Sequence, residues 1–69
     1  MSVPLRLATT GTQRPGAVCV DIELGDSCGD RVVVAVWATT IGEAVINAEA
    51  CCDERLGGDW VISDWRGLG

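Results

Sequence analysis

The chain contains no histidine, no lysine, no tyrosine and no phenylalanine. These absences exclude histidine-based catalytic triads, histidine metal sites, Walker-type phosphate loops and lysine Schiff bases. The only basic residues are five arginines, which face ten acidic residues and leave a net charge of −5. Because phosphate contacts need basic side chains, we expect no direct binding of nucleic acid and no enzymatic activity of these classes.

The sequence also has no CxxC pair among its four cysteines, Cys19, Cys28, Cys51 and Cys52. A zinc knuckle is therefore not indicated, and the adjacent Cys51 and Cys52 cannot easily bridge each other. We expect neither a metal nor a cofactor. A thiol enzyme or redox carrier using Cys28 or Cys51 is the least supported function, because no motif supplies the cation or helix N-terminus that activates a thiol.

Long hydrophobic runs are missing as well. No stretch approaches the roughly 18 apolar residues of a membrane helix, and no basic patch followed by an apolar run suggests a signal peptide. We therefore expect no membrane association and a cytoplasmic location with reduced thiols. With 69 residues, of which 48% are hydrophobic, the chain is expected to form a single domain over residues 1–69.

Hydrophobic periodicity predicts four strands and one helix. Residues 3–9 and 17–24 alternate as half-buried strands do, and residues 31–38 are apolar on both faces, as in a central strand. Thr40 and Glu43 fit a capping box, so a helix should run from there to about Leu56 and end at Gly57 and Gly58. Residues 59–66 form the last strand. The helix should bury one stripe: Ile41, Ala44, Val45, Ala48, Cys52 and Leu56.

This order, β-β-β-α-β, predicts an α+β fold with two layers. One helix packs on one face of a four-stranded, mostly antiparallel sheet. We expect the first three strands to form an antiparallel meander. The helix should return the last strand parallel to the third one, beside the third or the first.

Carboxylates and tryptophans are the candidate partner-binding residues. Asp21 and Glu23 share a strand face and lie roughly 6.6 Å apart, a spacing of the order of that between neighbouring phosphates. Asp53 and Glu54 lie in the last helical turn, where the macrodipole disfavours anions by about 0.3–1 kcal/mol. The full acidic set is Asp21, Glu23, Asp26, Asp30, Glu43, Asp53 and Glu54. The alternative interpretation is an ordinary solvated acidic surface.

Three tryptophans add a second indication. Trp37 should share a face with Asp21 and Glu23 if the valines of residues 31–38 meet the helix. Trp60 and Trp65 are five positions apart, so a regular strand would point them to opposite faces. We predict Trp37 and Trp65 as interface anchors. The alternative is that all three tryptophans fill the core.

In size, element order, acidity and the acidic residues above, the chain resembles the small acidic anti-CRISPR proteins of phages and mobile elements. Several members of that class imitate the phosphate backbone of DNA. The resemblance implies a non-enzymatic inhibitor in the cytoplasm of a bacterial host cell. Its partner would be a type I (Cascade-like) CRISPR effector with a basic nucleic-acid-binding groove. The inhibitor would block the binding of target DNA to that effector.

A second hypothesis is a small protein–protein interaction module, antitoxin-like or homodimeric, without nucleic-acid mimicry. The exposed edge of the first or last strand and an apolar patch would carry it. We expect a monomer or a weak dimer under the first hypothesis and a stable dimer under the second.

Overall fold

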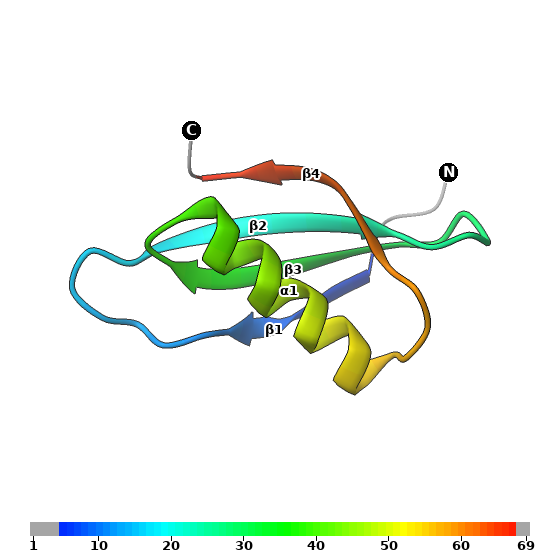
Figure 1. Ribbon diagram of the computed structural model, residues 1–69, viewed down its shortest axis with the longest axis horizontal. Coiled ribbons are helices and arrows are strands. Elements are labelled where there is room, and N and C mark those ends of the chain that lie inside the picture. Colours follow the sequence, from blue (N-terminus) through cyan, green and yellow to red (C-terminus); the bar gives the residue numbers. More distant parts are fainter. Residues whose placement is uncertain (1–4, 68–69) are drawn as a thin grey trace.

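The computed structural model describes residues 5–67 of the chain. Along the sequence the elements are β1 (Leu5–Thr10), β2 (Val18–Gly25), β3 (Arg31–Ala38), α1 (Ile41–Arg55) and β4 (Val61–Arg66). Figure 1 shows the strands as one layer, with α1 crossing one face of it. The predicted α+β class, element order and two-layer arrangement are confirmed. The predicted start of the first strand, at residues 3 and 4, lies outside the described residues.

The strand order in the sheet is β1-β3-β2-β4. β2 pairs antiparallel with both β3 and β4, whereas β1 pairs parallel with β3. The predicted meander of the first three strands is therefore wrong. The last strand does run in the direction of β3, as expected, but it pairs with β2 instead of with the third or first strand. Two of the three strand pairs are antiparallel, so the sheet is mostly antiparallel.

The loop over residues 11–17 explains why β1 lies beside β3. The loop passes the end of β3 so closely that a Cβ on Gly11 would lie 2.7 Å from the Trp37 carbonyl oxygen. Gly11 also has a φ of +89°, a backbone conformation that favours glycine. A connection of this length carries the chain past the end of β3, so that β1 and β2 lie along opposite edges of β3.

The core lies between α1 and the face of the sheet that α1 covers. Apart from Val18 at the start of β2, which is 40% exposed, the residues of β2 and β3 that point to this face are fully buried: Val20, Ile22, Leu24, Val32, Val34, Val36 and Ala38. Small side chains on α1, namely Ala44, Ala48, Cys51 and Cys52, allow the helix to lie close to the sheet. Leu56, predicted on the buried stripe, is instead 41% exposed because it is the C-cap at the end of the helix.

Both ends of α1 follow the predicted signals. The Thr40 hydroxyl accepts a hydrogen bond from the Glu43 backbone N–H at 3.2 Å, as an N-cap does. At the other end Gly57 has a φ of +69°, and its N–H donates to the Cys52 carbonyl at 3.0 Å. A glycine in this conformation ends the helix without steric cost.

We expect Ile22→Ala to lower the free energy of unfolding by about 2–5 kcal/mol, because it opens a cavity in the core. Ile46→Ala is the matched control, since Ile46 lies on α1 with 69% of its surface exposed whereas Ile22 has none exposed. The control should change stability by no more than about 0.5 kcal/mol. Urea unfolding followed by tryptophan fluorescence measures both. Equal losses at the two positions would contradict the described placement of α1.

We expect Gly11→Ala to destabilise the fold more than Gly29→Ala. Gly29 has a φ of +88°, nearly that of Gly11, but nothing lies within 4 Å of the position where its Cβ would be. Both variants should lose about 1–2 kcal/mol from the positive φ, and only Gly11→Ala adds the collision with the Trp37 carbonyl. Urea unfolding of the pair separates the two effects. A loss no larger for Gly11→Ala would show that the loop does not pass against β3.

Candidate functional site

The face of the sheet away from α1 carries the candidate site residues that were predicted on β2 and β3, namely Asp21, Glu23 and Trp37. We call it the open face. Strand register places these residues on it: Arg6 of β1; Arg31, Val33, Ala35 and Trp37 of β3; Cys19, Asp21 and Glu23 of β2; Asp64 and Arg66 of β4. The prediction that Trp37 shares a face with Asp21 and Glu23 is confirmed, because the valines on the other face are buried under α1.

Arginines compensate the two acidic residues predicted at the centre of this face. Arg6 Nη2 lies 3.4 Å from Asp21 Oδ1, and Arg31 Nη1 lies 3.6 Å from Glu23 Oε1. The Ser63 hydroxyl adds a hydrogen bond to Glu23 Oε2 at 3.2 Å. Solvent-exposed ion pairs contribute little stability, about 0–1 kcal/mol each. Their consequence here is electrostatic: Asp21 and Glu23 do not present an uncompensated negative surface.

A shallow hollow of about 210 Å³ lies on the open face. Two predicted site residues of the open face, Asp21 and Glu23, line it, and Trp65, which the register places opposite Ile22 and so on the α1 side of the sheet, borders it at β4. The other lining residues are Arg6, Val33, Asp64 and Arg66. The arginines were not among the predicted site residues, because each meets its acidic partner across strands and no local pattern indicates the contact. The hollow therefore brings charges of both signs together around Val33.

Trp65 is 48% exposed, as expected of an interface residue, but its register differs from the prediction. The pairing of β4 with β2 shifts between Glu23 and Leu24, so that Trp65 lies opposite Ile22 and Ile62 opposite Leu24. This irregularity inserts one residue, and the alternation of a regular strand no longer holds across it. Trp60 is half-buried against the core, and its indole N–H donates to the Gly57 carbonyl at 2.9 Å.

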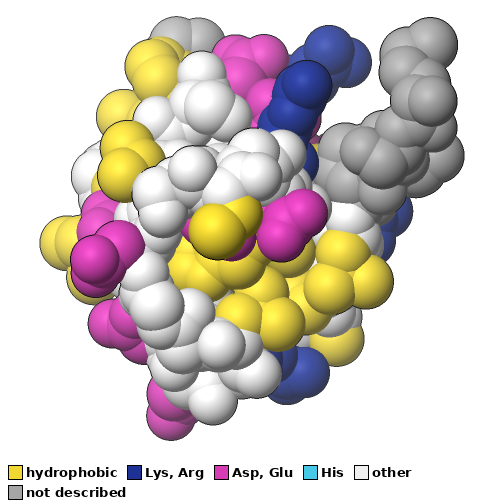
Figure 2. All heavy atoms as spheres, turned by 90° about the vertical axis from the view of Figure 1, so that its right-hand side faces the viewer, with side chains coloured by type: hydrophobic (Ala, Val, Ile, Leu, Met, Phe, Trp, Pro, Cys, Tyr) yellow, Lys and Arg dark blue, Asp and Glu magenta, His cyan; other side chains and the backbone are white. Residues whose placement is uncertain are grey.

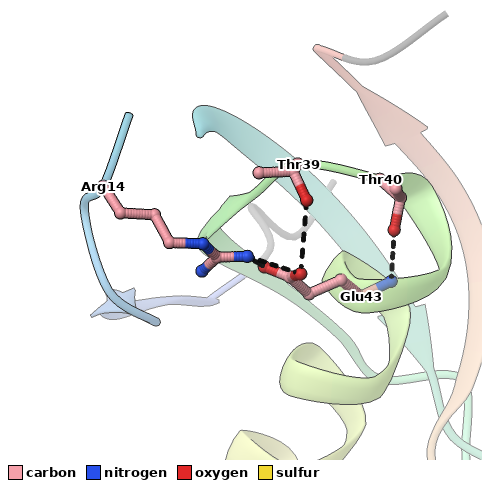
Figure 3. A network of polar contacts seen from close by, with 4 residues as sticks. All are labelled: Arg14, Thr39, Thr40 and Glu43. Carbon is pink, nitrogen blue, oxygen red and sulfur yellow. Dashed lines mark hydrogen bonds and ion pairs between the residues drawn. The ribbon is translucent and has the colours of Figure 1, made fainter. Parts of the chain in front are cut away.

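Glu43 belongs to a separate polar network at the start of α1 (Figure 3). Arg14, from the loop between β1 and β2, places Nη2 2.6 Å from each carboxylate oxygen of Glu43. The Thr39 hydroxyl donates to Glu43 Oε2 at 3.4 Å. Hydrogen bonding from Arg14, and to a lesser extent its charge, holds the pKa of Glu43 below its ordinary value. Glu43 thus fastens the loop to the helix, a contact that no sequence spacing indicated.

We expect Arg14→Gln to raise the pKa of Glu43 toward its ordinary value, because the strongest hydrogen bond to the carboxylate is lost. An NMR titration of the side-chain carboxyl carbons measures this directly. Arg55→Gln, at the far end of α1, should leave the Glu43 titration unchanged. Since the pKa of Glu43 is lowered in the folded state, its pairing stabilises the fold at neutral pH and is lost as the pH falls through that pKa. An unchanged titration in Arg14→Gln would contradict the contact.

Asp26 and Asp30 lie in the hairpin loop between β2 and β3. Asp26 Oδ1 accepts from the Cys28 N–H at 3.0 Å and from the Asp30 N–H at 2.8 Å. Asp26 therefore shapes the turn, as an aspartate at such a position commonly does. Asp30 is exposed at the hairpin. The structure does not bring either residue together with Asp21 and Glu23 in the hollow.

The outward face of α1 carries acidic residues that are not compensated in this way. Glu49, Asp53 and Glu54 are exposed, and within residues 5–67 no arginine lies within 4.0 Å of their carboxylates. Ile46, 69% exposed, precedes Glu49 by three positions and shares its side of the helix. We call this set, Ile46, Glu49, Asp53 and Glu54, the acidic helix surface. Ile46 and Glu49 were not predicted as site residues, although their spacing of seven and four positions from Asp53 on a helix could have indicated both.

Apolar side chains gather at one end of the molecule. Figure 2 views the end formed by the hairpin between β2 and β3 and the C-terminal end of α1, and shows a hydrophobic area bordered by charged groups. Exposed aliphatic residues at this end are Leu5 at the start of β1, Leu56 after α1 and Val61 at the start of β4. This is an apolar patch of the kind that the second hypothesis required.

The cysteines are free, and two are buried. Burial raises the pKa of the Cys52 thiol, and the neighbouring Cys51, Asp53 and Glu49 raise it further. A thiol whose pKa is raised is protonated at neutral pH and is a poor nucleophile. Cys52 is thus a packing residue of the core.

Within residues 5–67, no helix has the length and apolar character needed to cross a membrane. Among the same residues, no three histidine, cysteine, aspartate or glutamate side chains are grouped as a metal site would need. No known protein family, curated protein or solved structure matches the chain significantly.

Proposed function

We propose that this chain is a non-enzymatic inhibitor that occupies a basic, nucleic-acid-binding groove of another protein. The observation that carries the proposal is the acidic helix surface, where Glu49, Asp53 and Glu54 are exposed without a compensating arginine in the described part of the chain. The resemblance to anti-CRISPR proteins makes a type I (Cascade-like) CRISPR effector the first target to test.

The position of these acidic residues supports a binding role. Asp53 and Glu54 lie in the last turn of α1, where the exposed carbonyl groups of the helix disfavour negative charge. Arg55 is the basic residue of that turn. A charge placed against the local preference, without a partner inside the fold, is typical of residues that serve an external contact.

The geometry also shifts the proposed contact away from Asp21 and Glu23. Those two carboxylates already face Arg6 and Arg31, so a partner would have to displace intramolecular pairs to reach them. On α1, Glu49 and Asp53 follow each other by about 6 Å along the helix axis. Ile46 would add an apolar contact between the charges. A helix of this kind fits a groove through one face.

A second candidate is an interaction module without nucleic-acid mimicry, antitoxin-like in its mode of action. The apolar end with Leu5, Leu56 and Val61 favours it. Such a module would bind its partner by burial of apolar surface, and salt would therefore weaken the complex little.

We expect Asp53→Asn/Glu54→Gln to weaken binding to a purified type I effector at least tenfold, because two charge contacts to basic side chains are lost. Asp21→Asn/Glu23→Gln removes the same charge from the open face and should change the affinity less than about threefold. Biolayer interferometry with nanomolar concentrations of the chain measures both. Target duplex DNA should compete, and higher salt should weaken the complex.

Binding that survives high salt and both double substitutions would contradict the acidic helix surface as the contact. Binding that DNA does not compete for would contradict occupation of the nucleic-acid groove. Failure to bind any type I effector, together with retention of a partner at high salt through the apolar end, would favour the second candidate.

A further inference from the structure

Residues 5–17, which comprise β1 and the loop after it, contribute little to the core. Within residues 5–67, every buried hydrophobic side chain belongs to β2, β3 or α1. In β1, Leu7 is partly buried against these elements and Leu5 is 55% exposed. We propose that residues 5–17 form a strap that opens as a unit while β2, β3 and α1 stay folded, with the contact between Arg14 and Glu43 as its latch.

β1 is held at the edge of the sheet by a short pairing. Its parallel register with β3 is regular over residues 5–7 and shifts before Thr10. β2, by contrast, pairs with the other edge of β3 in unbroken register over residues 18–25. Parallel pairs are slightly less stable per residue than antiparallel ones. β3 is therefore held more firmly by β2 than by β1.

An ion pair is a further tie of β1 to the sheet. Arg6 Nη2 lies 3.4 Å from Asp21 Oδ1, and both side chains are open to solvent. Pairs of this kind add little stability, because water competes for both charges. Opening of the strap breaks this contact at small cost.

The latch joins the loop to the start of α1. The Ala17 N–H donates to the Arg14 carbonyl at 2.9 Å, and Pro15 and Gly16 lie between them, Gly16 with a φ of +85°. Proline followed by a glycine of positive φ is typical of a type II turn. From this turn Arg14 places Nη2 2.6 Å from each carboxylate oxygen of Glu43 (Figure 3).

The receiving half of the latch belongs to the part that stays folded. The Glu43 N–H donates to the Thr40 hydroxyl, and the Thr39 hydroxyl donates to Glu43 Oε2. Glu43 is thereby fixed in the first turn of α1, whose buried side pack on β2 and β3. While the latch is closed, the chain that leads back to β1 starts beside the sheet, which favours the closed strap.

Opening leaves most of the core in place. Apart from Leu7, the packed side chains belong to elements outside the strap, so they keep their partners when β1 leaves. Regions with few buried apolar contacts and solvent-exposed hydrogen bonds open at a lower free energy than the whole domain. The groups that lose partners are the backbone N–H and C=O groups along the β1 side of β3. The acidic helix surface lies outside the strap, so its opening does not depend on the proposed function.

Hydrogen exchange of the natural chain tests the opening, because β3 reports on both of its neighbours. Alternate N–H groups along a central strand point to opposite sides, so those of β3 pair in turn with β1 and with β2. We expect the amides bonded to β1 to exchange at least about tenfold faster than those bonded to β2, since local opening releases only the first set. NMR in deuterated water measures each amide, under conditions in which the opening equilibrium governs the rate.

Two variants separate the strap from the rest of the fold. Ile22→Val weakens the core between β2 and α1 in the closed and in the open form alike. It should speed exchange of the β2-bonded set about two- to tenfold and leave the β1-bonded set unchanged. Arg14→Gln removes the latch, which the closed form alone contains, and should speed both sets by the same factor, about two- to fivefold. Arg14→Gln/Glu43→Gln should be no faster than the faster of the two single variants, because the residues form one contact.

Equal exchange of the two sets in the natural chain overturns the strap, because β1 then leaves only when the whole chain unfolds. An Ile22→Val variant in which both sets are faster by the same factor also overturns it. If Arg14→Gln speeds only the β2-bonded set, or neither set, the latch is overturned, since the contact then persists when β1 opens or contributes nothing to the closed form.

Discussion

Within residues 5–67 a single helix packs on a sheet that has two faces, and the rest of the structure follows from that constraint. α1 can cover only one side, so the buried residues of β2 and β3 converge there, and every small side chain that α1 buries faces them. The other side must be acceptable to water or to a partner. The chain meets this requirement by placing charged residues of both signs around a short apolar row.

The acidic residues of the molecule fall into two groups, those that contact an arginine within the fold and those that do not. Asp21 and Glu23 on the open face and Glu43 at the start of α1 contact arginines within the fold, whereas Asp64 on the open face has no arginine within 4.0 Å among residues 5–67. The acidic residues on the outward side of α1 have none either. A net charge computed from composition cannot distinguish the two cases. Acidic residues of the second group present uncompensated negative charge, and three of them, Glu49, Asp53 and Glu54, lie on one helix.

Sequence patterns predicted the elements better than the way they pair. Residues 31–38 and the helix between Thr40 and Gly57 could be predicted because hydrophobic periodicity and capping are local. The placement of β1 beside β3 could not, since it depends on a loop that crosses a strand distant in sequence. Strand periodicity could predict that Trp37 shares a face with Asp21 and Glu23. The inserted residue in β4 and the arginine partners of the acidic residues could not be predicted, because each depends on a contact between distant segments.

The parallel pairing of β1 with β3 has a consequence for how the molecule assembles. The hairpin of β2 and β3 and the helix that follows are joined by short connections, so they can form from local contacts. β1 can add to the sheet only after β3 has formed, because Leu5 pairs with Val32 and the whole of β2 lies between them in the sequence. Arg14 can contact Glu43 only after the first turn of α1 has formed. β1 therefore leaves the ribosome before its pairing partner β3, and it can pair only after β3 has followed.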